Sequence, residues 1–194
     1  VPPDVGFNLE VKYPCSDKYR HLRTLPHFEL NRYVDDILEQ VFEHAGSRRI
    51  IFSCFDPDVC TLLRAKQPRY PVLFLTEGGT SLKYRDTRSH SLEAAVLFAK
   101  SEGLQGIVTE CTPLLERPSL TSVIKDTGLL LFSYGDKNTS YDAVALQKAW
   151  GVDAVISDNI GDLTKLAGKV LDSDYSLWRE HGRAARERGG EGEA

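Results

Sequence analysis

The sequence predicts an α/β protein built on a parallel β-sheet. Six short apolar segments alternate with six segments of helical periodicity along almost the whole 194-residue chain. Strands that are joined through helices run parallel, because each crossover returns the chain to the same end of the sheet. Two architectures fit this alternation: an open doubly wound sheet, and a (β/α)₈ barrel from which two units are absent. The strand count alone favours the open sheet.

Turn residues and helix caps bound each predicted strand. The strand candidates are Val5–Tyr13, Ile50–Phe55, Val72–Thr76, Gly106–Glu110, Leu129–Tyr134 and Ala154–Asp158. The helix candidates are Arg32–Ala45, Asp58–Gln67, Ser91–Glu102, Ser119–Asp126, Ser140–Trp150 and Asp162–Val170. Several helices begin at a Ser or Asp that can accept hydrogen bonds from free backbone N–H groups, and several end at a glycine. Gly78-Gly79 is too short for a dinucleotide-binding loop.

Composition excludes some classes of protein. No apolar run approaches the roughly 18 residues of a membrane-spanning helix, so no transmembrane segment is expected. The net charge is −4 and no basic patch precedes the tail, which gives no support for a nucleic-acid partner. The four cysteines form no Cys-x-x-Cys pair, and the placement of Cys54 and Cys111 on apolar strands suits a reducing, cytoplasmic location. The oligomeric state is not predicted.

The sequence suggests where the folded domain starts and ends. It begins at Val1, contains no Met and enters an apolar strand almost at once, so we expect a fragment whose start is missing. After Leu171 the sequence becomes charged and then rich in Gly and Glu. We therefore expect residues 1–171 to form the folded domain and residues 172–194 to form a charged, disordered tail.

The first strand carries polar residues on one of its faces. Side chains alternate along a strand, so Asn8, Glu10 and Lys12 share a face opposite Phe7, Leu9 and Val11. A strand covered on both sides should be apolar on both faces, and unpaired buried charges are expensive. One interpretation is a metal-binding carboxylate beside a cation that contacts a phosphate. The alternatives are a buried ion pair between Glu10 and Lys12, or an edge strand with a solvated face.

At this point the sequence resembles the glycerophosphodiester phosphodiesterases. The resemblance covers roughly residues 4–168 and is closest to the eukaryotic branch that acts on glycerophosphocholine-like substrates. Its first motif, a Glu-x-Lys strand, is Gly6-Phe7-Asn8-Leu9-Glu10-Val11-Lys12-Tyr13. A Ser-x-Phe strand follows at Ser53-Cys54-Phe55, and further similar segments are Tyr70–Thr76, Leu104–Val108, Ser133-Tyr134-Gly135 and Gly151–Asp158.

The resemblance implies a (β/α)₈ barrel whose third to eighth strands are present here. It implies Mg²⁺ or Ca²⁺ held partly by Glu10, a phosphate contact from Lys12 as a catalytic residue, and substrate contacts from Lys12 and Tyr134. For Phe55, near the end of its strand, we consider both a substrate contact and a core position. The implied reaction is hydrolysis of a small-molecule glycerophosphodiester to an alcohol and sn-glycerol 3-phosphate.

The sequence also departs from the family's pattern. The resemblance implies a His-Arg motif, a Glu-x-Asp metal pair and a second histidine, and none of these lies in residues 1–194. His21 and His27 lie in a long loop instead, and His44 lies near a helix end. We therefore expect this chain alone to have little or no activity. The alternative functions are a non-catalytic α/β interaction domain and a different phosphodiesterase barrel.

Overall fold

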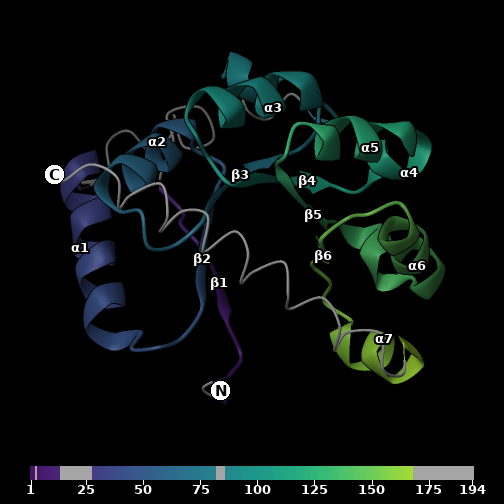
Figure 1. The fold of residues 1–194 in the computed structure, drawn as a ribbon, viewed down its shortest axis with the longest axis horizontal. Helices are drawn as coiled ribbons and strands as arrows, with labels where there is room; N and C mark the ends of the chain where they lie inside the picture. Colours follow the sequence, from purple (N-terminus) through teal and green to yellow (C-terminus); the bar gives the residue numbers. More distant parts are fainter. Residues whose placement is uncertain (3, 14–27, 82–85, 168–194) are drawn as a thin grey trace, which may run out of the picture.

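The protein forms one curved sheet of parallel strands with helices along its convex side. The structure is a computed structural model, and it describes residues 1–2, 4–13, 28–81 and 86–167. Its six strands pair in strict chain order, from β1 to β6. Figure 1 shows the sheet bent into an arc, with α1, α2, α3, α5 and α6 outside it. A doubly wound sheet reverses its strand order and is covered on both faces, so the structure confirms the incomplete (β/α)₈ barrel.

All six predicted strands are present, and the two at the edges are shorter than predicted. The strands are β1 (Phe7–Glu10), β2 (Ile50–Cys54), β3 (Val72–Thr76), β4 (Gly106–Glu110), β5 (Leu130–Tyr134) and β6 (Ala154–Val155). Among the described residues, β1 pairs only with β2, and β6 pairs only with β5. In the described part of the chain each of these strands has one ladder of hydrogen bonds, so its regular pairing stops sooner than the predicted strand does.

The helices also follow the predicted order, with one addition. They are α1 (Leu30–His44), α2 (Pro57–Lys66), α3 (Leu92–Ser101), α4 (Thr112–Glu116), α5 (Ser119–Asp126), α6 (Tyr141–Ala149) and α7 (Ile160–Ala167), with short 3₁₀ turns η2 (Thr87–Ser89) and η3 (Asp136–Thr139). Helix α1 begins earlier than predicted because Glu29 accepts hydrogen bonds from the N–H groups of Asn31 and Arg32. Helix α4 was not predicted. Residues 168–170 of the last predicted helix, and the predicted tail, lie outside the described residues.

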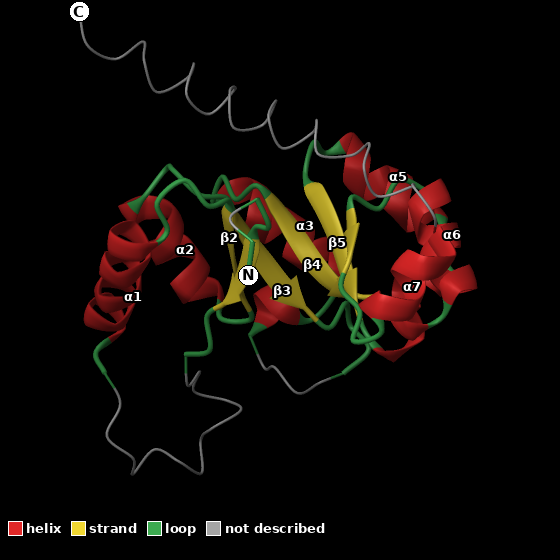
Figure 2. Cartoon of the chain, turned by 90° about the horizontal axis from the view of Figure 1, so that it is seen from below, coloured by secondary structure: helices red, strands yellow, loops and turns green. Residues whose placement is uncertain are grey.

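Side-chain alternation divides the core into two layers. The outer layer lies between the sheet and the helices and includes Val11, Phe52, Phe74, Ile107 and Leu131. The inner layer covers the concave face of the sheet and consists of Ile51, Leu73, Leu75, Val108, Leu130 and Phe132. Figure 2 shows the strands from another side, with α1 and α2 at one flank of the sheet and α6 and α7 at the other. We call the concave side the inner face.

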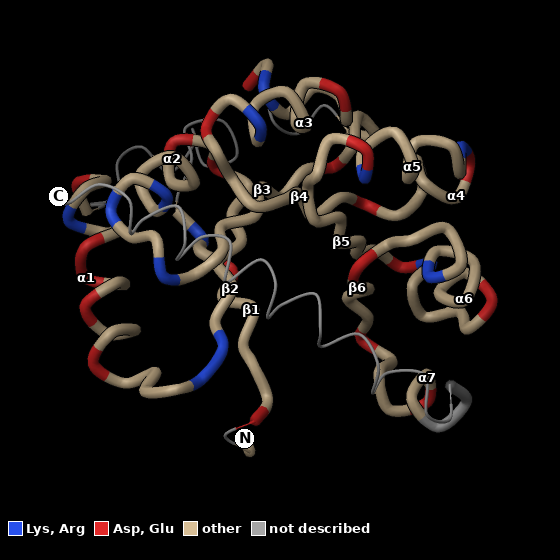
Figure 3. The backbone as a smooth tube through the Cα atoms, viewed as in Figure 1, with Lys and Arg blue, Asp and Glu red and all other residues tan. Residues whose placement is uncertain are grey.

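Charge and hydropathy are distributed as in an ordinary globular domain. Acidic and basic segments are interspersed around the outer helices (Figure 3). None of the helices in the described ranges is long and apolar enough to cross a membrane. Whether the protein lacks a nucleic-acid partner stays a prediction.

Three cysteines lie in the described part of the chain, and all are free and buried. They are Cys54, Cys60 and Cys111. Burial raises the pKa of the Cys60 thiol well above its usual value, because the charged thiolate is poorly solvated there. These thiols therefore behave as small apolar groups, as the sequence predicted for Cys54 and Cys111.

A carboxylate at the amino edge of the sheet joins three elements. Asp153, directly before β6, accepts a hydrogen bond of 2.7 Å from the backbone N–H of Leu131 in β5. It also accepts one of 2.6 Å from the Lys125 ammonium in α5. The Asp153 side chain is only 9% exposed, so water cannot replace these donors easily. This contact fixes the short edge strand β6 against its neighbour.

We expect Asp153→Ala to lower the free energy of unfolding by about 2–4 kcal/mol, because the variant leaves a backbone N–H and a partly buried ammonium without their acceptor. Urea unfolding followed by circular dichroism measures the change. Asp126→Ala, an exposed position at the end of the same helix α5, is the control and should change stability by less than about 0.5 kcal/mol. Equal stability of the two variants would contradict the assignment.

Candidate active site

The register of the sheet collects polar and aromatic residues at one place. Glu10 is in register with Ser53, and Glu110 is in register with Tyr134. Residues in register on parallel strands point to the same side, so alternation places a row of such residues on the inner face where the strands end. The row, which we call the carboxyl edge, consists of Glu10, Phe55, Glu77, Glu110, Tyr134 and Asp158. This edge carries the active sites of parallel barrels.

Backbone contacts fix the chain where it carries Glu10 and Lys12. Between them, Val11 is buried in the outer core, and its N–H donates to the Ser53 carbonyl at 2.8 Å. The Cys54 thiol donates to the Val11 carbonyl at 2.8 Å, and the Tyr33 hydroxyl donates to the Lys12 carbonyl at 3.1 Å. The chain therefore keeps an extended path beyond the end of β1, and Glu10 and Lys12 lie together on the side opposite Val11, as alternation predicted.

Glu10 and Lys12 form a loose, exposed pair. The Lys12 Nζ lies 3.6 Å from a Glu10 carboxylate oxygen, and the side chains are 74% and 39% exposed, respectively. Such a pair contributes little to stability, because water screens both charges. A pair therefore exists, but it is not the buried ion pair considered from the sequence. Both charged groups remain accessible to a ligand on the inner face.

Phe55 and Tyr134 meet across the inner face. Their ring centroids are 6.0 Å apart and their planes are nearly perpendicular, the edge-to-face arrangement that aromatic rings prefer. The Tyr134 hydroxyl donates to the Thr76 carbonyl at the end of β3, at 3.3 Å. Both rings are half-buried and pack against the inner core. The pair thus closes the top of the inner core and also forms part of the carboxyl edge, so the two positions considered for Phe55 are compatible.

A hollow of about 380 Å³ lies beside Tyr134 at the carboxyl edge. Its lining consists of Glu77, Glu110, Tyr134, Gly135, Asp136, Ile156, Ser157 and Asp158. The described lining is acidic on several sides and has one aromatic wall. Glu10 and Lys12 do not line it, so this loose ion pair lies apart from the acidic hollow.

Glu110 stabilises the start of α4 and is not a freely available ligand. Its carboxylate accepts hydrogen bonds from the N–H and the hydroxyl of Thr112, at 2.8 and 3.1 Å, and one of 3.4 Å from the Cys111 thiol. Burial and the adjacent Glu110 carboxylate raise the pKa of Cys111 to about 11, which keeps the thiol protonated as a donor. A Cβ at Gly135, whose φ is 128°, would lie 2.6 Å from this carboxylate, so the close approach requires glycine.

Asn138 holds one wall of the hollow. This fully buried residue in η3 donates to the Ser133 hydroxyl at 3.2 Å and to the Ile156 carbonyl at 3.1 Å. Its side-chain oxygen accepts a hydrogen bond of 2.8 Å from Gln147 in α6. The loop after β5, the end of β6 and α6 therefore share one buried amide, which fixes the separation of the two sides of the hollow.

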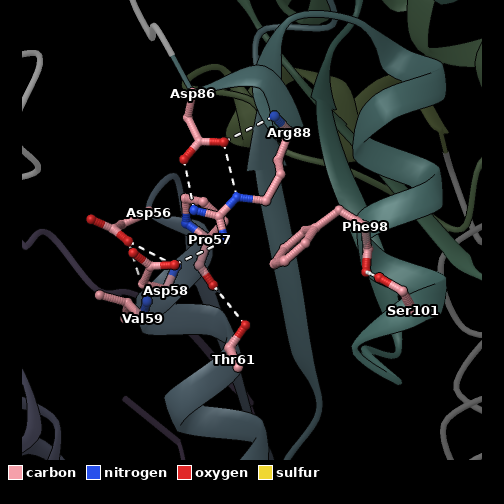
Figure 4. Close-up of polar contacts among 9 residues, drawn as sticks. All are labelled: Asp56, Pro57, Asp58, Val59, Thr61, Asp86, Arg88, Phe98 and Ser101. Atoms are coloured by element: carbon pink, nitrogen blue, oxygen red, sulfur yellow. Dashed lines mark hydrogen bonds and ion pairs between the residues drawn. The ribbon is translucent and has the colours of Figure 1, made fainter.

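Arg88 ties the end of the β3–α3 connection to the start of α2 (Figure 4). Its guanidinium donates to both oxygens of Asp86, at 2.9 and 2.7 Å, and to Asp58 at 2.8 Å, and it lies over the Phe98 ring. Asp56 accepts hydrogen bonds from the N–H groups that begin α2. Hydrogen bonds from Arg88 lower the pKa of Asp86, whereas burial raises the pKa of Asp56. Sequence reasoning missed this contact, although the short Asp86-x-Arg88 spacing was a signal.

Of the three histidines considered from the sequence, His44 lies among the described residues. His21 and His27 lie outside the described residues. His44 occupies the last turn of α1 with an exposed side chain, near the helix end as the sequence predicted. Within the described residues no group of three or more His, Cys, Asp or Glu side chains is arranged to hold a metal ion. The described residues could therefore contribute one carboxylate ligand, Glu10, to a metal site, but they do not form a complete site.

The chain thus has a parallel barrel sheet with a carboxylate and an ammonium side by side where its first strand ends, and the comparison with known families identifies the class of protein. The model of the glycerophosphoryl diester phosphodiesterase family matches residues 1–162. The chain belongs to this family.

Curated relatives and solved structures agree with this assignment. The chain is 40% identical over 176 residues to a glycerophosphocholine phosphodiesterase of Eremothecium gossypii, covering 90% of this chain and 13% of that protein. It is 39% identical over 168 residues to a human glycerophosphocholine phosphodiesterase, covering 84% of this chain and 25% of that protein. The chain thus spans only a small part of these relatives. A crystal structure from Silicibacter pomeroyi, 20% identical, shares the fold with a TM-score of 0.61 over 83% of this chain and 50% of its own.

We expect Arg88→Met to lower the free energy of unfolding at pH 7 by about 1 kcal/mol, because the Arg88 side chain is 35% exposed and its ion pairs are partly screened. Arg88 lowers the pKa of Asp86, so this stabilisation is complete above the ordinary Asp pKa of about 4 and is lost as pH falls through the lowered value. The difference between wild type and variant should therefore shrink below about pH 4.

Urea unfolding at a series of pH values measures this difference. Arg64→Met is the control, because Arg64 donates to the Gly103 carbonyl, which does not titrate. A pH-independent difference for Arg88→Met, like that of the control, would show that Asp86 is not its partner.

Proposed function

We propose that the protein is a metal-dependent glycerophosphodiester phosphodiesterase to which this chain supplies part of the active site. The substrates are glycerophosphodiesters such as glycerophosphocholine, and the products are an alcohol and sn-glycerol 3-phosphate. The observation that carries the proposal is the accessible Glu10–Lys12 pair at the carboxyl edge of the inner face, in a chain of this family. The relatives described above are glycerophosphocholine phosphodiesterases, which supports the choice of substrate. Three buried free cysteines support a cytoplasmic location.

In this proposal Glu10 holds Mg²⁺ or Ca²⁺. Hard divalent cations take oxygen ligands, and a half-exposed carboxylate whose charged contact among the described residues is 3.6 Å long can supply one. The family resemblance assigns the remaining carboxylates to a Glu-x-Asp pair outside residues 1–194. When bound, the metal supplies Lewis-acid polarisation of a phosphate oxygen.

Lys12 interacts with the phosphate. Its ammonium is on a flexible stem, is largely exposed, and lies on the same side as Glu10. A cation placed here offsets the negative charge that grows on the phosphoryl oxygens in the transition state, and for this reason we assign Lys12 a catalytic role. The hydrogen bond from Tyr33 to the Lys12 carbonyl keeps the base of this flexible side chain in place.

Phe55 and Tyr134 provide the apolar contacts of the substrate. Their rings cover the inner core and present a surface that can pack against the carbon atoms of a glycerol backbone or head group. The same rings keep water out of the sheet interior below the reacting phosphate. Tyr134 also borders the acidic hollow, so a substrate group that extends from the phosphate past this ring would enter an acidic environment.

We expect Glu10→Gln in the full natural chain to lower kcat/KM for glycerophosphocholine by about 10³-fold, because the amide keeps the shape but loses the charge that holds the metal.

Lys12→Met should lower kcat by about 10²-fold with a smaller change in KM, because it removes an interaction that strengthens in the transition state. Product analysis with glycerophosphocholine and glycerophosphoinositol distinguishes this reaction from that of another phosphodiesterase barrel.

The controls are Glu116→Gln on α4 and Lys100→Met on α3, which make the same chemical changes on the outer helices. Both should keep near wild-type rates. Unchanged activity and metal dependence in Glu10→Gln would remove Glu10 from the site.

For residues 1–194 expressed alone, we expect kcat/KM to be at least about 10³-fold below that of a family member that carries both histidines and the Glu-x-Asp pair, because the members of a catalytic set act together. The assay uses glycerophosphocholine with Mg²⁺ or Ca²⁺, and circular dichroism confirms that the chain is folded. A rate comparable to that of the complete relative would contradict this expectation.

A further inference from the structure

Ser53, in register with Glu10, has a buried hydroxyl for which the described part of the chain provides no hydrogen-bond partner. It lies in β2, its side chain is completely buried, and its Oγ makes no hydrogen bond with the residues that the structure describes. Buried polar groups are nearly always paired, because an unpaired one has lost its contact with water. An unpaired hydroxyl next to a candidate site therefore calls for a donor–acceptor contact that a neighbouring side chain can supply by changing rotamer.

The surroundings of Ser53 leave few candidates for that partner. Along β2 its neighbours on the inner face are Ile51 and Phe55, which are apolar. Across the sheet it is in register with Leu73 on one side and with Glu10 on the other. Adjacent strands lie about 4.8 Å apart, so the Ser53 and Glu10 side chains stand side by side on one face. Among these neighbours, Glu10 alone offers a polar side chain.

The Glu10 carboxylate can accept further hydrogen bonds. Its contact with Lys12, at 3.6 Å, is longer than a hydrogen bond, and its side chain is exposed enough to change rotamer. An ionised carboxylate has two oxygens with about four acceptor positions. One oxygen can bind a cation while the other accepts a hydrogen bond from a neighbouring hydroxyl.

We propose that Ser53 is the positioning residue for Glu10: its hydroxyl donates to one carboxylate oxygen and directs the other toward the bound divalent cation. This inference rests on the proposed function, in which Glu10 is a metal ligand. Ser53 is completely buried, so in this role it acts through Glu10 rather than by binding the cation or the substrate itself. Hydrogen bonds of this kind orient ligating carboxylates in metal sites, and their removal weakens metal binding.

Ser133 provides a matched comparison within the same sheet. It is also a completely buried serine in a central strand, but its hydroxyl accepts a hydrogen bond from Asn138. Its neighbours Phe132 and Tyr134 point to the inner face, so Ser133 points to the outer face. Removing its hydroxyl disturbs a buried network without touching Glu10. The two Ser→Ala variants therefore make the same chemical change with different expected effects on metal binding.

The test measures cation affinity in the full natural chain. Isothermal titration calorimetry with Mg²⁺ alone, and separately with Ca²⁺ alone, gives the dissociation constant without substrate or turnover. We expect Ser53→Ala to raise this constant by about tenfold or more, as is typical for the loss of a hydrogen bond to a metal ligand. Ser133→Ala should leave the constant within about twofold of wild type, although thermal melting should show that it is destabilised.

Glu10→Gln separates this inference from the proposed function. If Glu10→Gln weakens cation binding and Ser53→Ala does not, the positioning role is overturned and the metal role of Glu10 stands. If Glu10→Gln has no effect, both are overturned. Ser53→Ala should have no further effect in the Glu10→Gln background, because the hydroxyl acts through that carboxylate. An equal loss in both backgrounds would mean that Ser53 acts elsewhere, and would also overturn the inference.

Discussion

The register between parallel strands is the constraint on which the rest of the structure depends. Every second residue of each strand points to the concave face, and the pairing of Glu10 with Ser53 and of Glu110 with Tyr134 aligns these residues between neighbouring strands. A slip of one residue would exchange the two faces of a strand, bringing Glu10 into the outer core and Val11 onto the site. The apolar requirements of two separate core layers thus fix the position of the polar residues at the carboxyl edge.

Polar contacts, in addition to apolar packing, hold the elements that surround this edge. Glu110 supplies the acceptor that begins α4, Asn138 joins the loop after β5 to the end of β6, and Arg88 joins the β3–α3 connection to α2. Loops at the end of a sheet expose backbone groups that no neighbouring strand can satisfy. Side chains with several donors or acceptors meet this need, and they give the edge a fixed shape above an apolar core.

The distribution of burial separates groups that support the site from groups that can bind a ligand. Ser53, Ser133 and Asn138 are completely buried, whereas Glu10 and Lys12 are partly or largely exposed and only loosely paired. A tightly paired Glu10 and Lys12 would have to separate before either could bind substrate or metal. Their loose contact requires little reorganisation, and the buried shell beneath them limits the directions that they can take.

The sequence by itself determined the local structure and the family. Periodicity placed all six strands, alternation placed Glu10 and Lys12 on one face, and the ordered motifs led to the family that the comparison confirmed. Only the tertiary structure decided which face is concave, that Phe55 meets Tyr134, that Glu110 begins α4, and that the Ser53 hydroxyl makes no hydrogen bond with the described residues. These features depend on curvature and on register between segments distant in the chain. A local pattern cannot predict them, because it indicates which side chains of a segment are buried but not which other segment they contact.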